Sequence, residues 1–331
     1  MYHRLYTLIF NMTDSEEKTP LEYWLALASV EGLGSVRIRR LIARFGSAQA
    51  IFEAELPEIA RLPSFNPVLA SRILTVSGNF PTFRERLNAL RDQEVRVMCL
   101  EDAAYPSQLK PLPDAPGILC SVGTLTELNE QCVAIVGSKE PSIEGIQLTL
   151  SLATQLVLAG FTVVSGLAAG IDTYAHSGAL AGMGKTVGVI GTDLSAIYPA
   201  RNNPLAVKVY EHGCLFSEHP FPSTPSPGNL IQRNRIISGL SMATIVVEAP
   251  KTGGAMHTAR YAQRQDRAVL ACRWDTQHSL SEGPRELIRT GAFPFASTEV
   301  DKVVDVLTHP ERLETYASGA ASEQMGLFEA E

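Results

Sequence analysis

Short apolar runs that end in glycine are the feature that most constrains the fold of this chain. In V-V-S-G-L-A-A-G-I-D-T-Y-A-H at 163–176, a β-branched run breaks at Gly166 and Gly170, and a helical pattern begins near Asp172. C-V-A-I-V-G at 132–137 has the same form. Runs of this kind, separated by helix-length segments, are typical of parallel strands in βαβ units. Ligands of such sheets bind at the carboxyl ends of the strands, where these glycine loops fall.

The pattern continues through the C-terminal two thirds of the chain. Strands are expected at 133–137, 162–165, 186–190, 215–218, 244–248 and 268–272. Helices are expected between and after them, at 145–159, 173–181, 205–211, 228–238, 255–264 and 284–290. A last apolar segment at 300–307 fits an edge strand or a helix. The alternation predicts an α/β fold, a Rossmann-like, doubly wound and mostly parallel sheet.

Residues 21–95 have helical spacing instead and predict a small helical domain. V-E-G-L-G-S at 30–35 lies between two helical stretches, as in a helix-hairpin-helix or SAM-like unit, whose turn amides can hold a phosphate. Four arginines follow the turn and would reinforce that contact, namely Arg37, Arg39, Arg40 and Arg44. The alternative is that the glycines only join two core helices and that the arginines lie on a solvated face.

These patterns divide the chain into four expected segments. They are a flexible arm at 1–20, the helical domain at 21–95, the Rossmann-like domain at 96–308 with a proline-rich connector at 106–116, and a disordered acidic tail at 309–331. The five cysteines form no C-x-x-C pair, and no apolar run approaches the roughly 20 residues that span a bilayer. We therefore expect a cytoplasmic protein without a metal site or a membrane segment. The net charge of −7 argues against non-specific coating of nucleic acid but allows a local basic patch.

Four clusters of polar residues fall at strand ends and are expected to meet in one crevice. The first combines hydroxyls, a lysine and helix-start amides, which suit an anion, in Gly137, Ser138, Lys139 and Ser142. The second contains Gly166, Gly170 and Asp172, with His176 one turn on. For the second cluster, the alternative is that Asp172 only caps the helix and His176 packs on it. The chain lacks G-x-G-x-x-G and the Walker lysine motif, so ordinary NAD or ATP binding has no signature here.

The third and fourth clusters bring arginines and carboxylates to the same strand ends. Arg201 lies in Y-P-A-R-N, and Q-R-N-R supplies Arg233, Asn234 and Arg235. Arginines near a helix start suit phosphate, because they are planar, bidentate and always charged; the alternative is a surface ion pair of little energy. Glu218 and Glu248 each end a strand, beside T-G-G-A-M-H-T-A at 252–259. They fit a nucleotide site, or else they neutralise the arginines and order the loops.

Together these strings resemble the DNA-processing protein A family, also called DprA or Smf. The matching strings are G-S-K-x-x-S, V-V-S-G-L-A-x-G-I-D-x-x-A-H, Y-P-x-x-N, R-N-R-I-I-S-G-L-S, V-V-E-A and T-G-G-x-x-H-T-A, in that order. The resemblance implies a protein that binds single-stranded DNA and helps to load the recombinase RecA onto it. It also implies a role in natural transformation, a homodimer, and no cofactor or chemical turnover.

The resemblance also assigns site residues. Lys139 stands where the family generally has arginine, Arg233 and Arg235 match its arginine pair, and Arg201 lies in a loop where a basic residue often appears. Two departures stand out, because Cys272-Arg273-Trp274 replaces a V-P-G and the stretch 283–288 lacks an asparagine expected to face the crevice.

The leading hypothesis is a cytoplasmic recombination mediator that protects incoming single-stranded DNA and loads RecA. Its phosphate contacts would be Lys139, Arg201, Arg233, Arg235 and the amides near Gly137 and Gly170. An alternative of another class is a nucleotide-sensing or nucleotide-hydrolysing enzyme related to the phosphoribohydrolases. The stretch 252–259 resembles their P-G-G-x-G-T-x-x-E motif in its glycines, although no glutamate ends it. A third reading is an interaction protein without a ligand.

Overall fold

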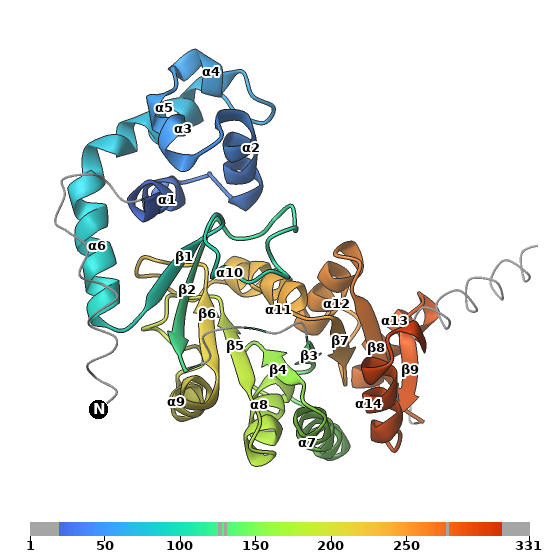
Figure 1. The fold of residues 1–331 in the computed structure, drawn as a ribbon. Helices are drawn as coiled ribbons and strands as arrows, with labels where there is room; N and C mark the ends of the chain where they lie inside the picture. The colour runs from blue at the N-terminus through green and yellow to red at the C-terminus, as the bar shows by residue number, and fades with distance from the viewer. Residues whose placement is uncertain (1–19, 125–127, 129–130, 276–277, 313–331) are drawn as a thin grey trace, which may run out of the picture.

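A nine-stranded sheet organises the larger part of the molecule, in the order β1-β2-β6-β5-β4-β3-β7-β8-β9 (Figure 1). The computed structural model describes residues 20–124, 128, 131–275 and 278–312. Strands β3 to β9 pair in parallel, whereas β1 and β2 add an antiparallel edge beside β6. The bounds are β1 Arg96–Cys99, β2 Ile118–Gly123, β3 Cys132–Val136, β4 Thr162–Ser165, β5 Thr186–Ile190, β6 Cys214–Ser217, β7 Ala243–Val246, β8 Ala268–Arg273 and β9 Phe293–Ala296. The expected Rossmann-like, mostly parallel sheet is confirmed.

The direction of winding changes at β3, whose two neighbours are β4 and β7. From β3 the chain builds outward through β4, β5 and β6 on one side, and later through β7, β8 and β9 on the other. Such a switch point leaves a crevice outside the carboxyl ends of the strands, where ligands of doubly wound sheets bind. The loop that follows β3 carries Lys139 into this position.

Helices cover both faces of the sheet, as Figure 1 shows. One face carries α7 Ile143–Leu158, α8 Ile171–Ala181, α9 Asn203–His212 and α14 Val300–Thr308, and the other carries α10 Pro227–Gln232, α11 Asn234–Leu240 and α12 Gly254–Arg264. Helix α13, Glu282–Arg289, contacts β8. Along β3, Val133 and Ile135 join the core under α7 and α8, while their neighbours in the strand join the core on the opposite face. This alternation is the period of two that a strand buried on both faces requires.

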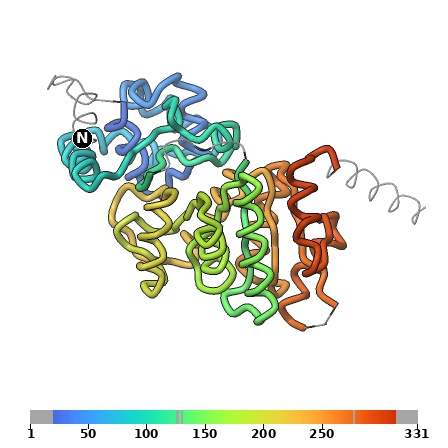
Figure 2. The backbone as a smooth tube through the Cα atoms, turned by 60° about the horizontal axis from the view of Figure 1, so that its bottom comes forward, coloured from blue at the N-terminus to red at the C-terminus, as the bar shows by residue number. Residues whose placement is uncertain are grey.

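Six helices form the N-terminal part, which packs on the antiparallel edge of the sheet (Figure 2). They are α1 Pro20–Ser29, α2 Ser35–Phe45, α3 Ala48–Glu53, α4 Leu56–Ala60, α5 Pro67–Thr75 and α6 Phe80–Asp92. The buried ring of Trp24 lies against Gly117, where an added Cβ would approach it to 3.0 Å. The indole nitrogen of Trp24 donates a 3.0 Å hydrogen bond to Glu101. The helical part and the sheet thereby share one continuous hydrophobic core.

The structure differs from the sequence-based expectations at two places, 228–238 and β9, and selects the helical alternative at 300–307. The expected helix at 228–238 is two helices, α10 and α11, joined at Arg233. The segment at 300–307 is helical as α14. Strand β9 was not expected, because F-P-F-A contains a proline; Pro294 is tolerated because β9 is the edge of the sheet. Most of the expected arm and tail lies outside the described residues, and the domain division at 95 and 96 stays a prediction.

Candidate nucleic-acid interface

The loops that follow β3, β4 and β7 meet at the switch point, and glycine makes the contact possible. A Cβ on Gly137 would lie 2.8 Å from the carbonyl oxygen of Glu248. Gly170 has a φ of +79°, and a Cβ there would lie 2.2 Å from the carbonyl oxygen of Ser138. That carbonyl instead accepts a 3.0 Å hydrogen bond from the amide of Ile171. The first two sequence clusters are therefore in direct contact, with the backbone of one loop laid against the other.

Glu248 occupies the position at the start of α7 where the sequence suggested an anion site. Its carboxylate is fully buried and accepts hydrogen bonds from the Ser142 amide at 2.9 Å and the Ser142 hydroxyl at 2.6 Å. The Ser142 hydroxyl in turn accepts from the Gly145 amide at 2.9 Å. A Cβ on Gly145 would lie 2.4 Å from the carboxylate, so only glycine fits there. The protein thus supplies its own anion to this helix start, and Glu248 orders the loop as the alternative interpretation stated.

Ser138 and Asn234 also make contacts within the chain. The Ser138 hydroxyl is buried and accepts a 3.1 Å hydrogen bond from the Glu140 amide, which closes the loop around Lys139. The Asn234 side chain is buried and donates at 3.3 Å to the carbonyl oxygen of Gly254, which joins α11 to the start of α12. Both residues shape the loops beside the switch point.

Arg233 is buried beneath the loop that follows β4. Its side chain donates to the carbonyl oxygens of Gly166 and Val189. A Cβ on Gly166 would lie 2.2 Å from the guanidinium, which explains the glycine. Burial lowers the pKa of Arg233, and the charge of Asp172 opposes that shift. Arg233 is only 5% exposed, and its guanidinium donates its hydrogen bonds within the protein. A DNA contact by Arg233 therefore stays a prediction.

Asp172 and His176 complete this buried cluster. The Asp172 carboxylate accepts from the amides of Gly166 at 3.1 Å and Ala168 at 3.3 Å, so it braces the loop upstream of its helix. Burial raises the pKa of Asp172, while the charge of Arg233 lowers it. His176 Nδ1 lies 2.7 Å from the hydroxyl of Thr186. Burial, and then the charge of Arg233, lower the pKa of His176 to about 3, so the imidazole is neutral in the folded protein.

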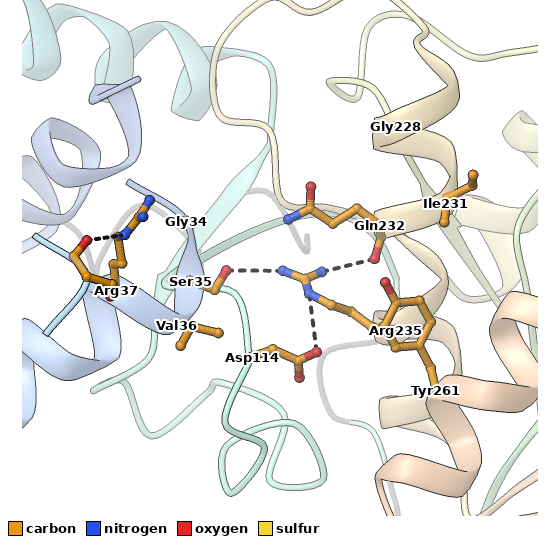
Figure 3. Close-up of a pocket in the computed structure, with 11 residues that line it drawn as sticks. Gly34, Ser35, Val36, Arg37, Asp114, Gly228, Ile231, Gln232, Arg235 and Tyr261 are labelled. Atoms are coloured by element: carbon orange, nitrogen blue, oxygen red, sulfur yellow. Dashed lines mark hydrogen bonds and ion pairs between the residues drawn. The ribbon is translucent and has the colours of Figure 1, made fainter. Parts of the chain in front are cut away.

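Buried Arg235 forms an ion pair with Glu218, and Figure 3 shows its further contacts with Ser35 of the helical part and with Asp114. Its guanidinium donates to both carboxylate oxygens of Glu218, at 3.0 and 2.6 Å. It also donates at 3.1 Å to the Ser35 hydroxyl at the start of α2 and lies 3.9 Å from the carboxylate of Asp114. The arginine therefore joins three segments, which are the helical part, the connector and the end of β6. This agrees with the interpretation that the carboxylates neutralise the arginines, although the pair is buried and not on the surface.

Among the described residues, the loops that follow β3, β5 and β7 carry three exposed cations, which we call the rim: Lys139, Arg201 and Lys251. Asn202, next to Arg201, donates to the carbonyl oxygen of Leu167 at 2.7 Å, which places the Arg201 loop beside the glycine loop after β4. Lys251 follows Glu248, whose carboxylate binds the start of α7, by three residues. Within the described part of the chain, no hydrogen bond or ion pair is recorded for these three side chains. Lys251 was missed in the sequence, where its position between V-V-E-A and T-G-G was the available signal.

The arginines of α2 serve the local fold. Arg37 donates to the carbonyl oxygens of Ser64 and Gly32, at 3.0 and 2.6 Å. Arg39 donates to the carbonyl oxygens of Lys110 and Leu112, at 3.0 and 2.7 Å, which ties α2 to the connector. Gly32 has a φ of +83° in the turn between α1 and α2, as a tight turn requires. These contacts fit the interpretation that the glycines make a turn between two core helices.

Residues 96–308 match the family described as DNA recombination-mediator protein A. The chain belongs to this family. Over 285 residues it is 35% identical to the protein Smf of Synechocystis, covering 85% of this chain and 70% of that protein. It is also 35% identical to the DNA processing protein DprA of Streptococcus pneumoniae over 234 residues, covering 68% of this chain and 83% of that protein.

Two solved structures of DNA processing protein A share the fold. The protein from Streptococcus pneumoniae superposes with a TM-score of 0.73 at 30% identity, covering 84% of this chain and 96% of that chain. The Helicobacter pylori protein, described for its single-stranded DNA binding mode, superposes with a TM-score of 0.58 at 28% identity, covering 65% of this chain and 97% of that chain. The recombination-mediator family thus includes a structural relative described as a single-stranded DNA binder.

Among the described residues, no helix has the length and apolar character to cross a membrane. Among the same residues, no group of three or more His, Cys, Asp or Glu side chains is arranged to hold a metal ion.

Proposed function

We propose that this chain is a single-stranded DNA-binding recombination mediator and that the strand lies on the rim. The observation that carries the proposal is the gathering of Lys139, Arg201 and Lys251 on three loops at the switch point. Their charges are exposed, whereas Arg233 is buried against carbonyl oxygens and Arg235 is paired with Glu218. A chain of net charge −7 attracts a polyanion only where positive charge is concentrated, which makes the rim the favoured place.

Family membership also supports a proposal about the biological process. We propose that the protein protects incoming single-stranded DNA during natural transformation and loads RecA onto it. We also propose that it does so in the cytoplasm, as a homodimer and without chemical turnover. The support is the family membership together with the relative described for its single-stranded DNA binding.

The rim is tested by reversing two of its charges. Lys139→Glu with Arg201→Glu is expected to weaken binding of a fluorescent oligo-dT in an anisotropy titration. The slope of log K against log salt should fall by about 0.7 for each lost phosphate contact. Because both side chains are exposed, the melting curve should stay unchanged.

Arg44→Glu with Arg61→Glu is the matched control. Both residues are exposed arginines in the helical part, so the double variant changes the net charge equally but leaves the rim intact. The control should bind oligo-dT as the wild-type protein does. Equal loss of affinity in both double variants would show that net charge, and not the rim, controls binding.

A further inference from the structure

A groove lies between the helical part and the sheet, close to the rim but separate from it (Figure 3). Its volume is about 630 Å³, which is in the range of small-molecule and nucleotide pockets. Val36 and Arg37 of α2 form one wall. Ile231 and Gln232 of α10 and Tyr261 of α12 form the other wall. Arg235 lies on the floor of the groove, where it is paired with Glu218. Its hydrogen bond to the Ser35 hydroxyl joins the two walls.

The groove continues from the rim along two helices. Arg233 contacts Gly166 under the rim, and Arg235, two residues later, contacts Ser35 in the groove. Helix α12 begins at Gly254, three residues after the rim residue Lys251, and reaches Tyr261 after about 10 Å at 1.5 Å per residue. A polymer bound at the rim therefore meets the groove within a few nucleotides.

Exposed arginines lie on α12, the helix that leads from the rim to the groove. Arg260 and Arg264 are exposed on α12 at i, i+4 spacing, and Arg264 lies three residues after Tyr261, so Arg264 is a neighbour of both side chains on the helix surface. Among the described residues, no ion pair is recorded for either arginine. Unpaired arginines beside an aromatic ring are the combination that single-strand binding surfaces use for phosphates and bases.

The walls of the groove suit a base and not a phosphate. Val36 is 50% exposed and Ile231 is 37% exposed, and both line the groove together with the ring of Tyr261. The floor arginine is already paired with Glu218, and the carboxylate of Asp114 lies beside it. An extra anion there would be repelled by this carboxylate. A flat, largely apolar base would instead bury apolar side chains that are otherwise exposed to solvent.

We propose that this groove is a second contact surface for the same DNA strand. Bases lie against Tyr261 and Ile231, Arg260 faces the phosphates on the rim side of the groove, and Arg264, three residues after Tyr261, faces those on the far side. Arg235 acts as a positioning residue that holds α2 opposite α10. The inference rests on the proposed function, because the strand that enters the groove is the one bound at the rim.

The test compares a short oligo-dT of about six nucleotides with one of about twenty, since single-strand sites span roughly 4–16 nucleotides. Tyr261→Ala should weaken binding of the long oligonucleotide by about 5- to 150-fold, the factor for a stacking contribution of about 1–3 kcal/mol. Arg264→Glu should lower the salt slope for the long oligonucleotide by about 0.7. Neither change should alter binding of the short one.

Three controls separate the possible causes. Tyr261→Phe keeps the ring and should bind the long oligonucleotide as the wild type does. Arg61→Glu matches the charge change of Arg264→Glu on an exposed arginine elsewhere and should have no effect on the salt slope. Ile231→Ser repeats the test at a partly exposed side chain, in case Tyr261→Ala lowers the melting temperature.

The outcomes distinguish this inference from the proposed function. If wild-type protein binds neither oligonucleotide, both proposals are overturned. If Lys139→Glu weakens binding of both lengths while Tyr261→Ala, Ile231→Ser and Arg264→Glu bind the long oligonucleotide normally, the rim stands and the groove is overturned.

Discussion

Two sets of positive side chains near the carboxyl ends of the strands have opposite surroundings. The rim residues Lys139, Arg201 and Lys251 are exposed. Arg233 and Arg235 are 5% and 4% exposed and are bound by carbonyl oxygens and carboxylates of the same chain. The comparison shows that a basic sequence motif can stabilise the fold through contacts within the chain. Basic residues on separate loops, in contrast, remain exposed and available to a ligand.

The largest difference between the two sets should appear in stability. Arg233→Ala leaves the carbonyl oxygens of Gly166 and Val189 buried without their donor and removes the positive charge near Asp172, and each buried acceptor left unsatisfied costs about 1–3 kcal/mol. Arg201→Ala, at the rim, should change the free energy of unfolding by less than about 0.5 kcal/mol. Urea unfolding of both variants measures the contrast. Equal stability of the two variants would remove the distinction between buried and exposed cations.

A smaller effect is expected at Glu248, which holds the loop of a rim residue. Glu248→Ala removes the acceptor of the Ser142 amide and hydroxyl, and hydrogen bonds to a charged group contribute about 1.5–3 kcal/mol. Glu248→Gln keeps one oxygen acceptor and should lose less. Amide hydrogen exchange at Ser142, together with urea unfolding, measures whether Glu248→Ala is destabilised more than Glu248→Gln. Oligo-dT affinity should fall in the same order, since the loop that carries Lys139 loosens; unchanged exchange in Glu248→Ala would contradict this role.

At neutral pH the smallest effect comes from His176 in the buried cluster, because its contribution to stability changes only below pH 6.5. The pKa of His176 is about 3 in the folded protein, against about 6.5 in the unfolded chain, so below pH 6.5 protons bind the unfolded state preferentially. Stability from this group is complete above pH 6.5 and falls by roughly 1.4 kcal/mol per pH unit as the pH drops toward 3. His176→Asn should flatten this part of the stability profile. His212→Asn, at an exposed histidine, should leave the slope unchanged, and equal slopes in all three proteins would contradict the prediction.

Local signals in the sequence were sufficient for most of the fold. The runs that became β4 and β5 were predicted with their observed bounds, because β-branched residues and flanking glycines mark a buried parallel strand. β9 was missed because Pro294 masks an edge strand whose neighbour β8 supplies the pairing. Single helices and strands thus follow from residues close in sequence, whereas an edge strand depends on its partner.

The candidate site was only partly predictable, because its partners lie far apart in the chain. Gly166, which accepts from Arg233, is 67 residues away, and Ser35, which accepts from Arg235, is 200 residues away. Spacing in the sequence alone cannot show that an arginine guanidinium will hydrogen-bond to residues of the same chain that lie so far away. The glycine loops around Gly137 and Gly170 were predictable, since close backbone approach leaves a glycine in the sequence.

The carboxylate of Glu248 has a consequence for which molecules compete at this surface. Phosphate groups bind readily at helix N-termini, and the start of α7 is already occupied by this carboxylate. A polymer, in contrast, can engage several separated cations at once. Under the proposed function, we therefore expect selectivity for long strands over mononucleotides to depend on Glu248, a side chain buried beneath the surface.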